Sequence, residues 1–174
     1  RVTARLGQVH SDKVVGIHTT SVTAPTPFMG PGTKELSDAE NAMLKQREQW
    51  LADEGGYSHI QSTKPQTLSY GLNDSPAGLA AWIVEKYRRW SDCDGDVERR
   101  FTKDELLTNV MIYWVTGTLN ASARFYHEHY HHPPAIIRGE WVEAPTAIAV
   151  FPKEQVRSPR SMVERQYNLQ RWTE

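Results

Sequence analysis

The chain has 174 residues, of which 39% are hydrophobic and 24% are charged, and its formal net charge is −1. This length suits one domain that buries a sizeable core, and the balanced charge argues against a nucleic-acid partner. No apolar run approaches the roughly 20 residues that span a membrane, and the single cysteine, Cys93, excludes an internal disulfide and fits a reducing, cytoplasmic location.

The amino-terminal segment reads as the beginning of an α/β structure. Residues 2–10 (VTARLGQVH) predict a short helix, and residues 14–18 (VVGIH) predict a brief buried strand. Proline and glycine residues then interrupt regular structure as far as position 32. Ser37 and Glu40 have the spacing of a capping box, which predicts that a helix begins there and ends at Gly55-Gly56.

Two further helix starts are marked by local sequence. Ser75 as N-cap and Pro76 as the first helical residue predict a helix that runs to about position 90. The polar segment 91–100 (SDCDGDVERR) is a connection, because its glycine and glutamate spacing does not fit an EF-hand. Thr102 and Glu105 then form a second capping box.

From this second box the sequence predicts one long helix, 103–126. Its buried face would carry the apolar residues Leu107, Met111, Trp114 and Phe125. Gly117 in the middle of a helix costs about 1 kcal/mol relative to alanine. We therefore expect that another part of the molecule or a ligand approaches the backbone closely at this glycine.

The carboxy-terminal segment returns to strand character. Residues 146–151 (TAIAVF) predict a second buried strand, 159–167 a helix, and 169–173 an edge strand. The order of elements is therefore that of an α/β fold with a helical insertion of more than a hundred residues. An insertion of this length between core strands is usually functional, and most often it is a lid.

Histidines cluster at 125–132 (FYHEHYHH), where His127 and His131 are spaced to share one face of a helix. The letters formally satisfy H-E-x-x-H, a zinc motif. However, Pro133-Pro134 follows at once, and no third ligand has motif support. We therefore expect no metal, and a non-catalytic metal-binding module remains an alternative. The sequence has no G-x-S-x-G elbow, no G-x-G-x-x-G fingerprint and no Walker loop, so no nucleotide cofactor is expected either.

Tyrosine and glutamate side chains offer a different chemistry. A phenol is a hydrogen-bond donor at neutral pH, and two phenols on one oxygen would stabilise a developing alkoxide as an oxyanion hole does. The residues alone do not say which tyrosines pair. Glu154 (FPKE) follows the strand at 146–151, the usual position of the triad acid in an α/β-hydrolase, with Glu140, Glu143 and Glu164 as nearby alternatives.

Three blocks resemble the epoxide hydrolases of the microsomal and juvenile-hormone type: GYSHIQSTKP (56–65), NDSPAGLAAWI (73–83) and KDELLTNVMIYWVTGTLNASARFY (103–126). The resemblance implies an α/β-hydrolase fold, with core segments at 1–18 and 145–174 and a helical lid at about 19–144. It implies that a small-molecule epoxide is hydrolysed to a vicinal diol through an aspartyl ester, without a cofactor. In that scheme Tyr57 and Tyr126 hold the epoxide oxygen, and Glu154 orients the catalytic histidine.

The same resemblance implies where the remaining groups lie. The family's nucleophilic aspartate would precede Arg1, and its histidine would follow Glu174 in a GGHF-like motif. We therefore expect the chain to be an internal segment without its nucleophile and base. Relatives range from detoxifying to hormone-processing and bacterial natural-product enzymes, and we favour a bacterial member. A dehalogenase-like hydrolase is the alternative, with Trp50, Trp82 and Trp114 as halide donors. Neither the substrate nor the oligomeric state follows from the sequence.

Overall fold

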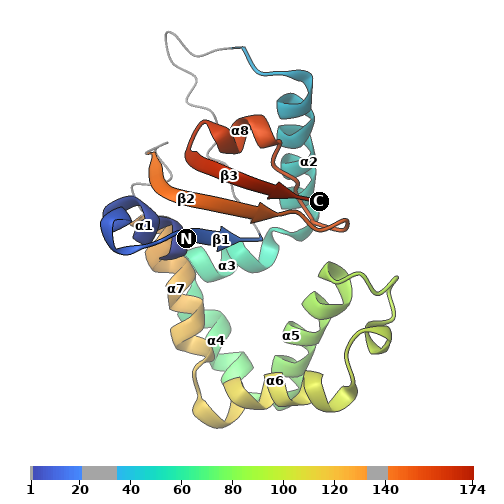
Figure 1. Cartoon of the computed structure of the whole chain (residues 1–174). Coiled ribbons are helices and arrows are strands. Elements are labelled where there is room, and N and C mark those ends of the chain that lie inside the picture. The colour runs from blue at the N-terminus through green and yellow to red at the C-terminus, as the bar shows by residue number, and fades with distance from the viewer. Residues whose placement is uncertain (1, 21–34, 133–140) are drawn as a thin grey trace. The chain divides into compact units, whose positions relative to one another are not determined.

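The computed structural model of the protein describes residues 2–20, 35–132 and 141–174. The chain divides into two units: an α/β unit made of Arg1–Asp53 and Pro134–Glu174, and a helical unit made of Glu54–Pro133. Figure 1 labels the elements of both units along the chain. Within the described ranges, no helix combines the length and the apolar character that crossing a bilayer requires.

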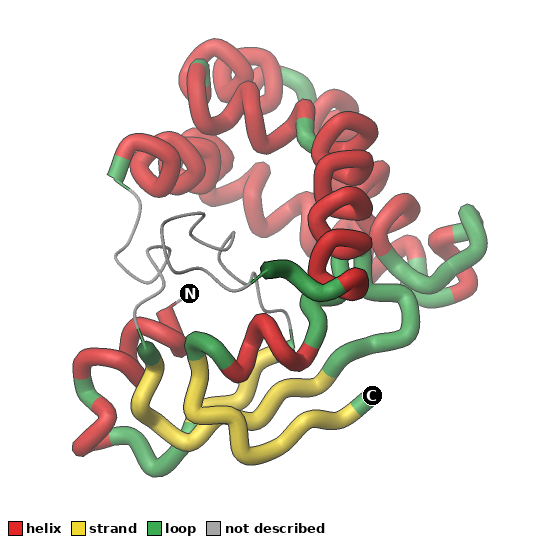
Figure 2. The backbone as a smooth tube through the Cα atoms, turned by 90° about the horizontal axis from the view of Figure 1, so that it is seen from above, coloured by secondary structure: helices red, strands yellow, loops and turns green. Residues whose placement is uncertain are grey.

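A parallel three-stranded sheet forms the centre of the α/β unit (Figures 1 and 2). Its strands are β1 (Ile17–Thr19), β2 (Val142–Ala149) and β3 (Tyr167–Thr173), and β2 lies between the other two. Every second residue of β2 is buried, because side chains alternate between the two faces of a strand. Helix α1 (Val2–Val9) packs on the buried face so closely that a Cβ on Gly7 would lie 3.1 Å from Cβ of Ala144.

The strands confirm the predicted α/β order, but their bounds differ from those expected. The predicted strand at 14–18 is wrong for its first half, because a 3-10 turn (Ser11–Lys13) comes first and Val15 is 98% exposed. The second strand begins at Val142 rather than Thr146, so it includes Pro145. Proline has no N–H for the ladder, and the β2–β3 register shifts between Val142 and Thr146.

The carboxy-terminal helix α8 (Arg160–Glu164) is shorter than the helix predicted at 159–167, because Tyr167 already begins β3. Helix α2 (Asp38–Glu54) begins with the predicted capping box: the Ser37 N–H donates to Glu40 Oε2 over 2.9 Å, and the Glu40 N–H donates to Ser37 Oγ over 3.3 Å. The Glu40 side chain is fully buried and also binds Arg165 Nη2 at 2.8 Å, which fixes α2 to the end of α8.

Five α-helices build the helical unit: α3 (Gly56–Thr63), α4 (Pro65–Asp74), α5 (Pro76–Trp90), α6 (Lys103–Thr116) and α7 (Leu119–His131), with a 3-10 turn at Val97–Arg99. Helix α7 packs against α3 and α4, and α5 packs against α4 and α6. The core of the unit is the cluster of Leu72, Leu79, Val110 and Leu119.

Both predicted helix starts in this unit are confirmed. The Gly78 N–H donates to Ser75 Oγ over 3.0 Å at the start of α5. At the start of α6, the Thr102 N–H donates to Glu105 Oε2 over 2.8 Å, and the Glu105 N–H donates to Thr102 Oγ1 over 3.2 Å. These bonds satisfy backbone N–H groups that have no partner within the helix.

The single long helix predicted at 103–126 is wrong. Helix α6 ends at Thr116, Gly117 adopts a left-handed backbone with φ 60°, and α7 begins at Leu119. A Cβ on Gly117 would meet nothing within 4 Å, so no other part of the described chain packs closely on this residue. The glycine serves the positive φ, which other residues rarely adopt.

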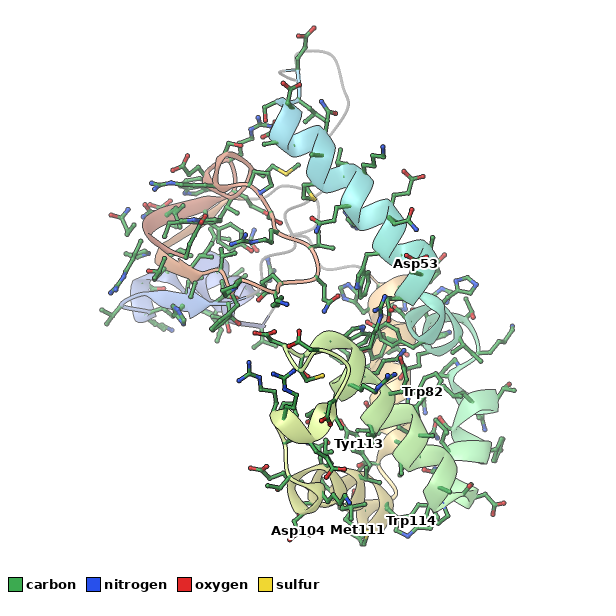
Figure 3. All side chains as sticks on the ribbon, turned by 90° about the vertical axis from the view of Figure 1, so that its right-hand side faces the viewer. Asp53, Trp82, Asp104, Met111, Tyr113 and Trp114 are labelled. Atoms are coloured by element: carbon green, nitrogen blue, oxygen red, sulfur yellow. The ribbon has the colours of Figure 1, made fainter. Side chains whose placement is uncertain are left out.

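The predicted buried face of this region is also largely wrong. Leu107, Met111 and Phe125 are 53%, 47% and 63% exposed, whereas Leu106 and Val110 are buried. Only Trp114 packs on the core as expected. Met111 and Trp114 are labelled on α6 in Figure 3. Because leucines stand at both 106 and 107, two apolar stripes fit the helical period. The buried stripe of α6 is the one that begins at Leu106, one residue before the predicted stripe.

Candidate functional site

A pocket of about 440 Å³ opens within the helical unit, between α3, α5, α6 and α7. The following residues line it: Tyr57, Gln61, Trp82, Ile83, Lys86, Tyr87, Trp90, Ser91, Asn109, Tyr113, Leu119, Ser122 and Tyr126. The break at Gly117 matters for this pocket, because it lets two separate helices, α6 and α7, contribute to the wall.

Tyr57 and Tyr126, the two tyrosines named from the sequence, meet at this pocket. Tyr57 lies in the first turn of α3 and Tyr126 in the second half of α7, two helices that pack together. Their ring centroids are 5.9 Å apart and the rings are nearly perpendicular, at 81°. Tyr126 is also a neighbour that raises the pKa of Tyr57.

The environment of Tyr57 keeps its phenol protonated. Burial raises the pKa of Tyr57 first, and the neighbouring Tyr126 adds to the rise through its charge when ionised and through their hydrogen bond, so that the pKa reaches about 12. Burial disfavours the charged phenolate. Tyr57 is therefore a neutral hydrogen-bond donor throughout the physiological pH range.

A tryptophan and a lysine complete the surroundings of Tyr57. The Trp90 ring meets the Tyr57 ring edge to face, with centroids 5.0 Å apart. Lys86 Nζ lies 5.2 Å from both centroids, within the range of a cation–π interaction. Lys86 also forms an ion pair of 2.6 Å with its neighbour Glu85.

The rest of the pocket wall is mainly apolar. Trp82 and Ile83 come from one face of α5, Tyr113 from α6 and Leu119 from the start of α7. Trp82 and Tyr113 are labelled in Figure 3. An apolar wall with a few convergent polar groups is typical of a small-molecule site. Here the polar groups include the Tyr57 and Tyr126 phenols.

Glu154 belongs to the other unit, the α/β unit. It lies on the loop that follows β2, as its position after an apolar run predicted, and its N–H donates to the Phe151 carbonyl over 3.2 Å. Burial raises the pKa of Glu154, and the positive charge of Arg157 offsets part of the rise. The Glu154 carboxylate therefore follows the carboxyl end of β2, the central strand of the described sheet.

The two alternative functions, a metal-binding module and a dehalogenase-like hydrolase, rest on histidines and tryptophans of the chain. The His127 and His131 rings are 4.2 Å apart on the last turns of α7. Across the parts of the chain that the structure describes, no group of three or more His, Cys, Asp or Glu residues could hold a metal ion. Of the three tryptophans weighed as halide donors, Trp82 lines the pocket, and Trp114 packs on the core of the helical unit.

Sequence reasoning missed several pocket residues, although a signal for some was present. The helix that runs to about position 90 was predicted, and one face of it lines the pocket with Trp82, Ile83, Lys86, Tyr87 and Trp90. Periodicity does not predict what this face contacts, because an apolar stripe on a helix has the same spacing whether it packs on a core or lines a cavity.

Comparison with known proteins then identifies the relatives of the chain. No protein-family model matches the sequence. The chain is 36% identical over 177 residues to a Stigmatella aurantiaca protein assigned as an epoxide hydrolase, covering 99% of this chain and 38% of that protein. It is 45% identical over 125 residues to epoxide hydrolase 1 of Sus scrofa, covering 67% of this chain and 28% of that protein. The chain is homologous to a segment of the epoxide hydrolases.

Solved structures agree with the sequence comparison. The juvenile hormone epoxide hydrolase of the silkworm Bombyx mori matches with a TM-score of 0.83 and 28% identity, over 98% of this chain and 45% of that one. The predicted fold class is therefore confirmed as an α/β-hydrolase fold with a helical lid. The chain spans less than half of the length of each of these three relatives.

Proposed function

We propose that the chain forms the lid and part of the core of an epoxide hydrolase, in which Tyr57 and Tyr126 bind and activate the epoxide oxygen. The observation that carries the proposal is the pair of phenols 5.9 Å apart between ring centroids on the wall of an apolar pocket. The relatives named epoxide hydrolases support the reaction class.

The chemistry of an epoxide explains why two donors are needed. Opening the ring breaks a C–O bond and leaves an alkoxide, which is a poor leaving group unless its charge is stabilised. Two phenol O–H groups aimed at one oxygen supply that stabilisation, and one of them can transfer its proton as the C–O bond breaks. The high pKa of Tyr57 means that the proton is present at neutral pH.

The remaining steps follow the scheme that the resemblance implies. An aspartate attacks the epoxide carbon and forms an ester, and a histidine then activates water, which hydrolyses the ester and releases the diol. Glu154 takes the role of the acid that orients the histidine and stabilises its positive charge. The aspartate and the histidine are not assigned to residues of this chain.

Replacing the tyrosines in the complete protein tests the proposal. With styrene oxide as substrate, Tyr57→Phe and Tyr126→Phe should each lower kcat by about 100-fold, the scale of losing one oxyanion donor. Tyr130→Phe is the matched control, because Tyr130 lies on the same helix as Tyr126 but is 61% exposed, and it should retain full activity. Diol formation that survives the double substitution would exclude the assignment.

Assaying the same variants with an alkyl bromide as well as styrene oxide distinguishes an epoxide hydrolase from the dehalogenase-like alternative. That class would release bromide from an alkyl bromide and would use tryptophan N–H donors to hold the halide. We expect diol from styrene oxide and no bromide release. Bromide release that persists after both tyrosines are replaced would instead favour the dehalogenase function.

A further inference from the structure

Glu54 is hydrogen-bonded to Trp90, whose ring packs on Tyr57. It is the last residue of α2, three positions before Tyr57, and only 11% of its side chain is exposed. Its Oε2 accepts a hydrogen bond from Trp90 Nε1 over 3.0 Å, and its Oε1 accepts one from Arg89 Nε over 2.6 Å. One carboxylate therefore connects the beginning of α3 to the end of α5.

The charge state of Glu54 suits this role. The hydrogen bond from Arg89 is the main cause that lowers the pKa of Glu54, burial works in the opposite direction, and the Trp90 hydrogen bond and the charges of Arg89 and Lys86 lower the pKa further. The carboxylate is thus ionised at neutral pH. Hydrogen bonds to an ionised acceptor are shorter and stronger than neutral ones.

The position of Trp90 then bears on Tyr57. An indole whose N–H is fixed can rotate little, and its ring lies 5.0 Å from the Tyr57 ring at an angle of 61°. This edge-to-face contact restricts the phenol from one side, while Tyr126 contacts it from another. A misplacement of about 1 Å in a catalytic group is enough to cost activity.

We infer that Glu54 is a positioning residue, which aims the Tyr57 hydroxyl at the epoxide oxygen by fixing the Trp90 ring. The inference rests on the proposed role of Tyr57. It assigns a function to a glutamate that is not among the residues lining the pocket. Its effect on the reaction must therefore disappear when the Tyr57 hydroxyl is absent.

A double-mutant cycle in the complete protein tests this requirement, with styrene oxide as substrate. Glu54→Ala should lower kcat about tenfold with little change in KM when Tyr57 is present, a coupling within the range of residues that share one contact network. In the Tyr57→Phe background the same substitution should change kcat less than about twofold. Glu54→Gln keeps an acceptor for the Trp90 N–H and should restore most of the kcat.

Two further variants make each outcome decisive. Glu98→Gln removes an exposed glutamate of the same unit that pairs with Lys103, and it should leave kcat unchanged. Trp90→Phe keeps a ring but removes the N–H that Glu54 binds, so it should lower kcat about as much as is expected for Glu54→Ala. It therefore tests the inference independently if the Glu54→Ala variant does not fold.

The inference is overturned if Glu54→Ala lowers kcat by the same factor in both backgrounds, since Glu54 would then act independently of Tyr57. Full kcat in Trp90→Phe overturns it as well. An unchanged kcat in Tyr57→Phe alone is a different result, because it removes the proposed role of Tyr57 itself and the inference with it.

Discussion

Two glutamates near the ends of α2, the partly buried Glu54 and the fully buried Glu40, serve different parts of the molecule. Glu54, at the last position of the helix, is bonded to the end of α5 beside the pocket. Glu40, in the first turn, caps the helix and binds Ser161 Oγ at 3.0 Å and Arg165 Nη2 at 2.8 Å. The first glutamate thus serves the candidate site, whereas the second serves the stability of the α/β unit.

The stability that Glu40 contributes should depend on pH. Burial pushes the pKa of Glu40 up, but the hydrogen bonds from Ser37 and Ser161 and the charge of Arg165 together hold it below its ordinary value. A carboxylate whose pKa is lowered on folding stabilises the protein above the pKa of the unfolded chain. That stabilisation is lost as the pH falls through the folded-state pKa.

We therefore predict that Glu40→Gln lowers the free energy of unfolding at pH 7 by about 2 kcal/mol, the scale of a hydrogen bond to a charged group. The difference from the unmodified protein should begin to shrink as the pH falls below the ordinary pKa of a glutamate, about 4.3. It should vanish only below the lowered folded-state pKa, where the carboxylate is protonated in both states. Urea unfolding over this pH range measures it. Glu48→Gln, at an exposed position of the same helix, is the control. A difference that stays constant down to pH 2 would contradict the prediction.

At the scale of single residues, the sequence indicates what chemistry a side chain could perform but not which other residues it contacts. A phenol is an evident proton donor, but nothing in the spacing of Tyr57 and Tyr126 pairs them, and their pairing came from the family resemblance. Glu54 was missed because its partners, Arg89 and Trp90, lie 35 and 36 positions away along the chain. Such contacts depend on how helices pack, which local sequence does not encode.

At the scale of secondary structure, signals confined to four residues were reliable. The capping boxes at Ser37 and Thr102 and the N-cap at Ser75 all form as predicted, since both partners lie within one turn. The helix break at Gly117 was missed because a glycine inside a helical pattern has two interpretations. It is either a tolerated helix residue or a left-handed cap, and only the backbone φ separates them.

The sign of a stability change distinguishes these interpretations of Gly117. In a continuous helix Gly117→Ala would stabilise the protein, because alanine is the better helix former by about 1 kcal/mol. At φ 60° the same substitution should destabilise it by about 1 kcal/mol or more, through backbone strain alone, since a Cβ there meets no other atom. Thermal or urea unfolding gives the sign.

Gly71 is the matched control for this experiment. It lies within α4 without a positive φ, and a Cβ there also meets nothing within 4 Å. Gly71→Ala should therefore stabilise the protein. Gly117→Asn should cost less than Gly117→Ala, because asparagine tolerates the left-handed region. A stabilising Gly117→Ala would mean that the turn between α6 and α7 is not formed.

At the scale of the whole molecule, the order of elements predicted the α/β fold and the long helical insertion. What it could not predict is that the insertion contains a core of its own. The Leu72, Leu79, Val110 and Leu119 cluster is separate from the cluster around Val142 and Val163 in the α/β unit. Periodicity marks an apolar face but not the partner on which that face packs.

Separate cores predict separate effects of core substitutions. Leu79 in the helical unit is fully buried, and Met162 in the α/β unit is 3% exposed and packs on Met43. Leu79→Ala and Met162→Ala should each leave a cavity and cost about 2–5 kcal/mol locally. Amide hydrogen exchange in the complete protein resolves where that cost appears, because local opening reports the stability of each cooperative unit.

We expect Leu79→Ala to reduce protection chiefly in α4–α7, and Met162→Ala chiefly in α2, α8 and the strands. A uniform loss of protection in either variant would show that the α/β unit and the helical unit unfold cooperatively together.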